Sequence, residues 1–212
     1  MVRGEIMRFY KPLDKILDQA DKVRILRFFV KTGAEWTGRQ ISKEIKISPA
    51  TCHKVLRELH KEGVLLFRSV GSGHLYKLNA AHYLVKNVLA PLFDGESAGY
   101  ARLKEILLKR LGRADAKKLV SAVVFGSVSK KTEAAKSDID ILLLVKNEKD
   151  KAAIEQKMTE AGDAIIREFG NAFSPYIQTV GEFKSKQSKK LPLVEEILKN
   201  NFLIAGKELK DI

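Results

Sequence analysis

The sequence predicts an α/β (α+β) fold divided into two domains. In the first third of the chain, apolar residues recur at helical spacing and then give way to two short β runs around glycines. In the last part, nearly all-apolar runs typical of buried strands alternate with amphipathic helical segments, as in a mixed sheet with helices. The predicted domains are residues 1–80 and 118–212, joined by a helical linker at residues 81–117.

Composition limits the classes of protein to consider. Hydrophobic residues make up 45% of the 212 residues, which is enough for a sizeable core and excludes global disorder. The formal net charge of +13 favours nucleic acid, nucleotides or another polyanion as partner. The single cysteine, Cys52, excludes an internal disulfide framework. Neither a signal peptide nor an apolar run of transmembrane length is found, so we expect a cytoplasmic protein without membrane association.

Three helices are predicted in the first domain. Apolar residues at helical spacing place the first within residues 13–29. The second begins near Thr37, which is a good N-cap residue. The third begins at Ser48, because Pro49 at the first helical position is a strong start signal, and it ends near Gly63.

A hairpin is predicted after the third helix, from two β runs at residues 64–70 and 74–78 around Gly71-Ser72-Gly73. Three helices and a hairpin resemble a winged helix-turn-helix domain, and residues 47–64 are similar to the recognition helix of bacterial and archaeal winged-helix repressors. The resemblance implies that the third helix enters the major groove of double-stranded DNA. The residues that it assigns to DNA binding, with a phosphate contact at the helix start, are Ser48, Thr51, His53, Lys54 and Arg57.

Winged helices also serve as protein-interaction modules, so a protein partner stays open for this domain. Residues 1–94 hold 17 Lys+Arg against 9 Asp+Glu, and this excess favours nucleic acid. His53, His60 and His74 match no zinc-binding spacing, and we interpret them as surface or cap residues.

Two helices are predicted in the linker. One precedes Pro91, and the other runs from about Ala98 to Leu111 and ends at Gly112. Helices in this position either form a homodimer interface or dock the two domains, and the sequence leaves both open.

The second domain is predicted to alternate strands with helices. The strands are residues 119–125, 139–145 and 175–180, and the helices are residues 148–169 and 191–198. Short connections between them indicate one mixed sheet covered by helices.

The loop between the first two of these strands carries the candidate chemistry. Asp138 and Asp140 are two residues apart at the start of a strand, so both carboxylates face the same side. Two like charges this close repel each other, and a divalent cation such as Mg²⁺ (or Mn²⁺) is the usual compensation. Gly126 lets the backbone approach a ligand, and Ser127 offers a hydroxyl and an amide N–H to a phosphate.

One stretch of the chain resembles the signature of the nucleotidyltransferase superfamily that includes DNA polymerase β. It consists of Gly126-Ser127, ten intervening residues and then Asp138-Ile139-Asp140. The similarity is greatest to the minimal prokaryotic members of this superfamily, which are often paired with a toxin partner. The resemblance implies that Gly126 and Ser127 hold a nucleoside triphosphate and that Asp138 and Asp140 are the catalytic, metal-binding residues. Ser137 also fits the pattern of the nucleotide site.

Two features of this sequence depart from that pattern. Val128, Lys130 and Lys131 stand where the minimal members carry arginine and glycine, and Lys130 is expected to serve the phosphates as a point charge. The family's third carboxylate, on the following strand, has no counterpart. Tyr176 and Gln178 share the relevant face there, and the nearest acid, Glu182, lies past the strand.

Two functions of different classes follow. In the first, a DNA-binding winged-helix protein carries a transferase domain that binds Mg²⁺ and a nucleoside triphosphate and moves a nucleotide to a hydroxyl acceptor. In the second, the protein is a transcriptional regulator whose degenerate nucleotidyltransferase domain only senses a nucleotide or binds a protein partner. The missing acid favours the second function, whereas the retained Gly126, Ser127, Asp138 and Asp140 favour at least nucleotide binding.

Overall fold

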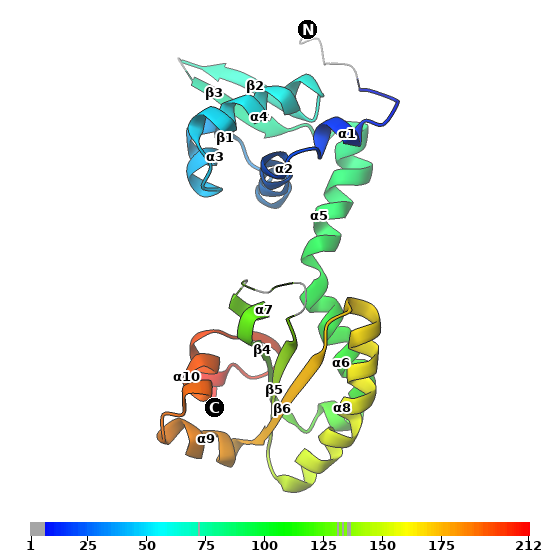
Figure 1. Ribbon diagram of the computed structural model, residues 1–212, viewed down its shortest axis with the longest axis vertical. Helices are drawn as coiled ribbons and strands as arrows, with labels where there is room; N and C mark the ends of the chain where they lie inside the picture. The colour runs from blue at the N-terminus through cyan, green and yellow to red at the C-terminus, as the bar shows by residue number, and fades with distance from the viewer. Residues whose placement is uncertain (1–6, 72, 131, 133, 135–136) are drawn as a thin grey trace. The chain divides into compact units, whose positions relative to one another are not determined.

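A computed structural model describes residues 7–71, 73–130, 132, 134 and 137–212 of the chain. The chain divides into two compact units, Met1–Ser97 and Ala98–Ile212, and each is described by itself. Both units combine helices with a sheet, which confirms the predicted α/β fold class (Figure 1). Within the described residues, no helix is both long and apolar enough to cross a membrane.

The N-terminal unit combines helices with a small antiparallel sheet of order β1-β3-β2. Its strands are β1 (Trp36–Thr37), β2 (Leu65–Val70) and β3 (Gly73–Leu78). Its helices are α1 (Leu13–Ile16), α2 (Ala20–Thr32), α3 (Gly38–Glu44), α4 (Pro49–Lys61), the π-helical η1 (Val85–Leu89) and α5 (Ala90–Ser97). The expected hairpin is formed by β2 and β3, and Ser72 of its turn lies outside the described residues.

N-cap residues determine where the two helices before the hairpin begin. Thr37 forms a capping box with Gln40 at the start of α3. Ser48 caps α4, its hydroxyl accepting a hydrogen bond from the Thr51 backbone N–H at 3.0 Å. The inner face of α4 then packs into the core of this unit, through Cys52, Val55, Leu56 and Leu59, all fully buried.

Replacing Ser48 with alanine is expected to lower the free energy of unfolding by about 1 kcal/mol, because the first turn of α4 loses its cap. Urea denaturation of the full chain measures this change. Ser48→Thr retains an oxygen that can cap the helix, so it should retain most of the stability. Equal losses in both variants would contradict the capping role.

The C-terminal unit contains a four-stranded mixed sheet of order β6-β5-β4-β7, in which β5 and β6 are parallel and the other pairs antiparallel. Its strands are β4 (Leu119–Phe125), β5 (Ile139–Val145), β6 (Phe173–Thr179) and β7 (Phe202–Gly206). Its helices are α6 (Gly99–Ala116), α7 (Gly126–Lys130), α8 (Glu148–Phe169), α9 (Val180–Ser188), α10 (Pro192–Lys199) and the 3₁₀ helix η2 (Leu209–Asp211).

Helices cover both faces of this sheet (Figure 1). On one face, Ile141 and Leu143 of β5 belong to a core shared with α6 and α8. On the other face, Leu142 and Leu144 belong to a core shared with α9 and α10. This burial on both sides explains why β5 is apolar throughout except at Asp140, near its first residue.

Several features of this unit differ from the sequence prediction. β7 adds a fourth strand to the sheet, and α7 forms within the stretch predicted as a loop. The predicted end at Gly112 is confirmed by its non-helical φ of 71° and ψ of 170°, but a further helical segment that was not expected extends α6 to Ala116. β6 begins at Phe173, two residues before the predicted start. α9 was not predicted, and it begins with a capping box between Thr179 and Glu182.

Candidate functional site

The turn at the end of β4 lies against the start of β5. Antiparallel pairing places Phe125, the last residue of β4, opposite Asp140. Gly126 follows with a φ of +74°, a conformation that favours glycine. A Cβ atom at Gly126 would lie 2.4 Å from Oδ2 of Asp140, so only glycine lets the carboxylate pack this closely. The structure therefore brings together two of the predicted site residues, Gly126 and Asp140.

The two aspartates lie in different environments. Asp138 is exposed and precedes β5, whereas Asp140 is half-buried within the strand. Burial raises the pKa of the Asp140 carboxyl above its ordinary value, and the negative charges of Asp138 and Glu196 raise it further. A cation bound at Asp140 would offset these effects and favour the ionised carboxylate. Among the described residues, however, no three His, Cys, Asp or Glu side chains are arranged to hold a metal ion.

Ser174 occupies the position beside Asp140 on the neighbouring strand. The parallel register pairs the two residues, and the Ser174 hydroxyl donates a hydrogen bond to Asp140 that acts to lower the pKa of its carboxyl. Tyr176 and Gln178 lie further along β6, opposite Leu142 and Leu144. A serine, not an acid, is therefore the β6 residue next to Asp140.

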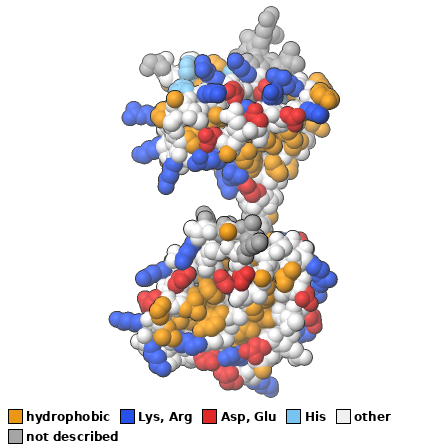
Figure 2. Space-filling model, viewed as in Figure 1, with side chains coloured by type: hydrophobic (Ala, Val, Ile, Leu, Met, Phe, Trp, Pro, Cys, Tyr) orange, Lys and Arg blue, Asp and Glu red, His pale blue; other side chains and the backbone are white. Residues whose placement is uncertain are grey.

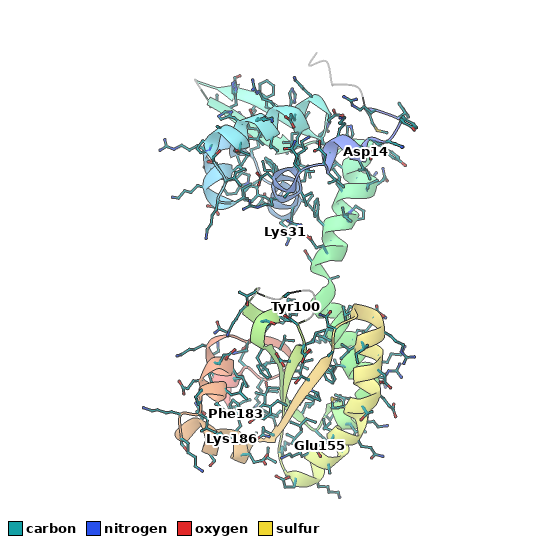
Figure 3. The ribbon with its side chains drawn as sticks, in the orientation of Figure 1. Asp14, Lys31, Tyr100, Glu155, Phe183 and Lys186 are labelled. Carbon is teal, nitrogen blue, oxygen red and sulfur yellow. The ribbon has the colours of Figure 1, made fainter. Side chains whose placement is uncertain are left out.

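Tyr176 and Gln178 both accept hydrogen bonds from one lysine of α9. The Nζ atom of Lys186 donates to the Tyr176 hydroxyl at 2.9 Å and to Oε1 of Gln178 at 2.5 Å. Figure 3 labels Lys186, which lies on α9. These two polar residues of β6 thus fix the position of α9.

Glu182 lies past the opposite end of β6 from Ser174 and has a structural role. Its side chain accepts a hydrogen bond from the Thr179 backbone N–H and forms an ion pair with Lys151 at 2.8 Å. The hydrogen bond from Lys151 is the largest cause that lowers the pKa of the Glu182 carboxyl. Glu182 therefore does not complete the carboxylate group at Asp140.

Glu196 is an acid near the site that sequence reasoning missed. It lies on α10, and its charge contributes to the raised pKa of Asp140. It also forms a 2.7 Å ion pair with Lys130, the predicted phosphate-binding lysine. No sequence signal links these residues, because α10 reaches the site only through the packing of the C-terminal unit.

Two side chains hold α7, the short helix that contains Ser127. The Ser129 hydroxyl is 3.0 Å from the backbone oxygens of both Gly126 and Asn200. The Tyr100 hydroxyl donates to the backbone oxygen of Val128 at 3.0 Å. Tyr100, labelled in Figure 3, also stacks on Phe202 with ring centroids 4.3 Å apart. Sequence reasoning missed both Ser129 and Tyr100.

Ser137, the last of the residues predicted for the nucleotide site, lies between α7 and β5. The Ser137 hydroxyl accepts a hydrogen bond from the Ala134 backbone N–H at 2.9 Å, and Nδ2 of Asn171 donates to the Ser137 backbone oxygen at 2.8 Å. Ser137 thus supports the loop that leads into β5, whereas Lys131 lies outside the described residues.

The predicted DNA-binding residues all lie on α4 or at its cap. His53, Lys54 and Arg57 are exposed, and Thr51 is half-buried. The Ser48 hydroxyl is 2.8 Å from the Thr51 hydroxyl, in addition to capping the helix. The exposed three form a basic outer surface on α4, opposite the apolar face that enters the core.

Comparison with known proteins finds a similarity for most of the C-terminal unit. Residues 108–208 match the family described as "Polymerase beta, Nucleotidyltransferase", which confirms the resemblance predicted for this part of the chain. Among solved structures, the chain is similar to one described as "Crystal structure of the toxin-antitoxin with AMP-PNP", at 19% identity and a TM-score of 0.34, over 51% of this chain and 77% of that chain. Comparison with curated protein sequences gives no match.

Proposed function

We propose that the C-terminal unit binds Mg²⁺ (or Mn²⁺) and a nucleoside triphosphate and transfers its nucleotidyl group to a hydroxyl acceptor, with pyrophosphate as the leaving group. The observation that carries this proposal is the packing of the Asp140 carboxylate against Gly126 at the end of β4. It joins a turn suited to phosphate with a carboxylate suited to a divalent cation. The family match over residues 108–208 supports the same chemistry.

Each residue of the site has a role in this proposal. Asp138 and Asp140 hold the cation, which supplies positive charge to the phosphoryl groups when it is bound. Gly126 and Ser127 hold the phosphates, and Ser137 keeps the loop in place. Lys130 serves the phosphates as a point charge, so a triphosphate competes with Glu196 for its ammonium group.

Ser174 favours a second candidate function of a different class. An acid next to Asp140 would help to hold a metal and to activate the attacking hydroxyl, and a serine does neither well. In this alternative the protein is a transcriptional regulator, and its nucleotidyltransferase domain senses a nucleotide or binds a protein partner with little turnover.

A transfer assay separates the two functions. The full chain is incubated with labelled nucleoside triphosphates, Mg²⁺ or Mn²⁺, and protein and nucleic-acid acceptors. Transfer by the wild type that disappears in Asp138→Ala/Asp140→Ala supports the enzyme. Asp163→Ala, an exposed acid on α8, is the matched control and should retain transfer. No transfer by the wild type to any acceptor would leave the regulator as the better account.

The hydrogen bond from Tyr100 to α7 predicts a positioning role. Tyr100→Phe removes the bond to Val128 but keeps a ring to stack on Phe202, so the fold should lose only about 1 kcal/mol. We expect weaker triphosphate binding with Mg²⁺, measured by calorimetry, because α7 is held less firmly. Tyr83→Phe, at an exposed tyrosine of the other unit, is the control. Unchanged triphosphate affinity in Tyr100→Phe would contradict the role.

For the N-terminal unit, we infer that α4 and the β2–β3 hairpin form a winged helix that binds double-stranded DNA. The exposed basic surface of α4 supports this inference. Duplex affinity should fall steeply with salt, and it should fall further in Lys54→Ala/Arg57→Ala. Lys31→Ala, on α2 and labelled in Figure 3, serves as control. A flat salt dependence, or full affinity in the double variant, would count against groove binding.

A further inference from the structure

A cavity lies between α4 and the β2–β3 hairpin, and the functions proposed above use only His53 and Arg57 of its lining residues. Its volume is about 510 Å³, which lies in the range of small-molecule sites. Its lining includes three histidines, two cations and a phenylalanine: His53, His60, His74, Arg57, Lys61 and Phe67. In Figure 2, histidine atoms lie beside Lys and Arg side chains on the N-terminal unit.

Phe67 provides an aromatic surface within this pocket. Its side chain lies on β2, lines the pocket and is 44% exposed. The rings of His60 and His74 approach it edge to face, at centroid distances of 4.7 and 5.3 Å. Tyr76, only 4% exposed, forms the inner wall. Such a ring, held by its neighbours and open to solvent, suits the packing of a second planar ring.

The charges around the pocket have one sign. Arg57 and Lys61 are four residues apart on α4, so they lie on the same face of the helix, and His53 precedes them by one further turn. No carboxylate is among the lining residues. An arginine fork beside a lysine is well suited to a phosphate group. The pocket thus combines an apolar platform with an anion-binding rim.

His60 adds a polar group of defined orientation. Its Nδ1 atom is 2.9 Å from the Leu65 backbone oxygen, which can only accept, so Nδ1 carries the proton of the neutral ring. In that tautomer Nε2 is a hydrogen-bond acceptor. A base with an exocyclic amino group could donate to it.

We propose that this pocket binds a nucleotide unit, with the base packed on Phe67 and the phosphate held by Arg57 and Lys61. The ligand is either a free nucleotide or one nucleotide of a single-stranded segment, since both present the same base and phosphate. The pocket is separate from the triphosphate site of the C-terminal unit. It shares His53 and Arg57 with the proposed duplex surface, so the experiment has to distinguish the two.

The test uses the full chain carrying Asp138→Ala/Asp140→Ala, which is expected to remove the nucleotide binding proposed for the C-terminal unit. Calorimetric titrations compare adenosine monophosphate, a single-stranded oligonucleotide and a duplex. Phe67→Ala is expected to weaken binding of the mononucleotide or the single strand by at least about fivefold. Arg57→Ala should weaken the same ligand, and Phe67→Tyr should retain most of the affinity.

Phe9→Ala is the matched control, because Phe9 is 89% exposed and does not line the pocket. Loss of mononucleotide binding in Phe67→Ala identifies a free-nucleotide site, and loss of single-strand binding alone identifies a strand-binding site. The proposal is overturned if neither ligand binds, or if Phe67→Ala binds as tightly as the control. Full duplex affinity in Phe67→Ala, together with its loss in Lys54→Ala, would show that the pocket and the duplex surface act separately.

Discussion

Gly126→Ala is expected to abolish triphosphate binding and to lower the free energy of unfolding by about 2 kcal/mol. An alanine Cβ would lie 2.4 Å from Oδ2 of Asp140, so the carboxylate must move away from the turn. The φ of +74° at this position adds strain for any residue with a side chain. Calorimetry with Mg²⁺ and a nucleoside triphosphate measures the first effect, and thermal unfolding measures the second.

Gly95→Ala is the control for this substitution. Gly95 lies in α5, and a Cβ there meets no atom within 4 Å, so alanine should leave nucleotide binding intact and leave stability equal or slightly higher. Wild-type affinity in Gly126→Ala would mean that the close approach of Asp140 to the turn is unimportant for the ligand.

Ser174→Asp is expected to raise the affinity for Mg²⁺ by about tenfold, because it adds a third carboxylate beside Asp140 on β6. If the wild type transfers nucleotides slowly, the rate should also rise. Without a cation the same change should destabilise the protein, since it adds a negative charge next to a carboxyl whose pKa burial already raises. Thermal unfolding with and without Mg²⁺ measures both effects.

Ser185→Asp, at an exposed position on α9, is the matched control for added charge. This substitution should change the stability of the protein little, and Mg²⁺ should not alter that stability. If Mg²⁺ stabilised Ser174→Asp against thermal unfolding no more than it stabilised this control, the register of β6 beside Asp140 would have no bearing on cation binding.

The centre of the C-terminal fold could be predicted from local sequence. The apolar runs of β4 and β5 predict these strands, because strands buried on both faces are almost wholly apolar. The turn at Gly126 directly follows β4, Asp138 directly precedes β5, and Asp140 lies at the start of β5. Pairing of these two strands therefore brings the three residues close together. The proximity of Gly126 to Asp140 follows from the antiparallel register.

The rest of the site depends on distant segments that local patterns do not place. A strand starting at Pro175 predicts Tyr176 and Gln178 at the site, whereas β6 begins at Phe173 and places Ser174 beside Asp140. The register is anchored by the Ile139 backbone N–H, which donates to the Ala172 backbone oxygen. Since parallel strands are joined by a long crossover, no turn in the sequence indicates this register.

Other omissions had different causes. α9 carries few apolar residues, but the capping box of Thr179 and Glu182 was a readable start signal. The roles of Tyr100 and Glu196 could not be read from sequence, because each reaches α7 from a different helix of the unit. For the N-terminal unit, capping and proline signals sufficed to predict α3 and α4.

Calorimetric titration of the full chain with a nucleoside triphosphate and Mg²⁺ is the strictest test of the proposed nucleotide site. We expect the wild type to bind only with the cation, and we expect its affinity to fall more than about 100-fold in Asp138→Ala/Asp140→Ala. The Asp163→Ala control should bind as the wild type does. Binding that is equally tight without Mg²⁺, or unchanged in the double variant, would contradict a nucleotide site built on Gly126, Asp138 and Asp140.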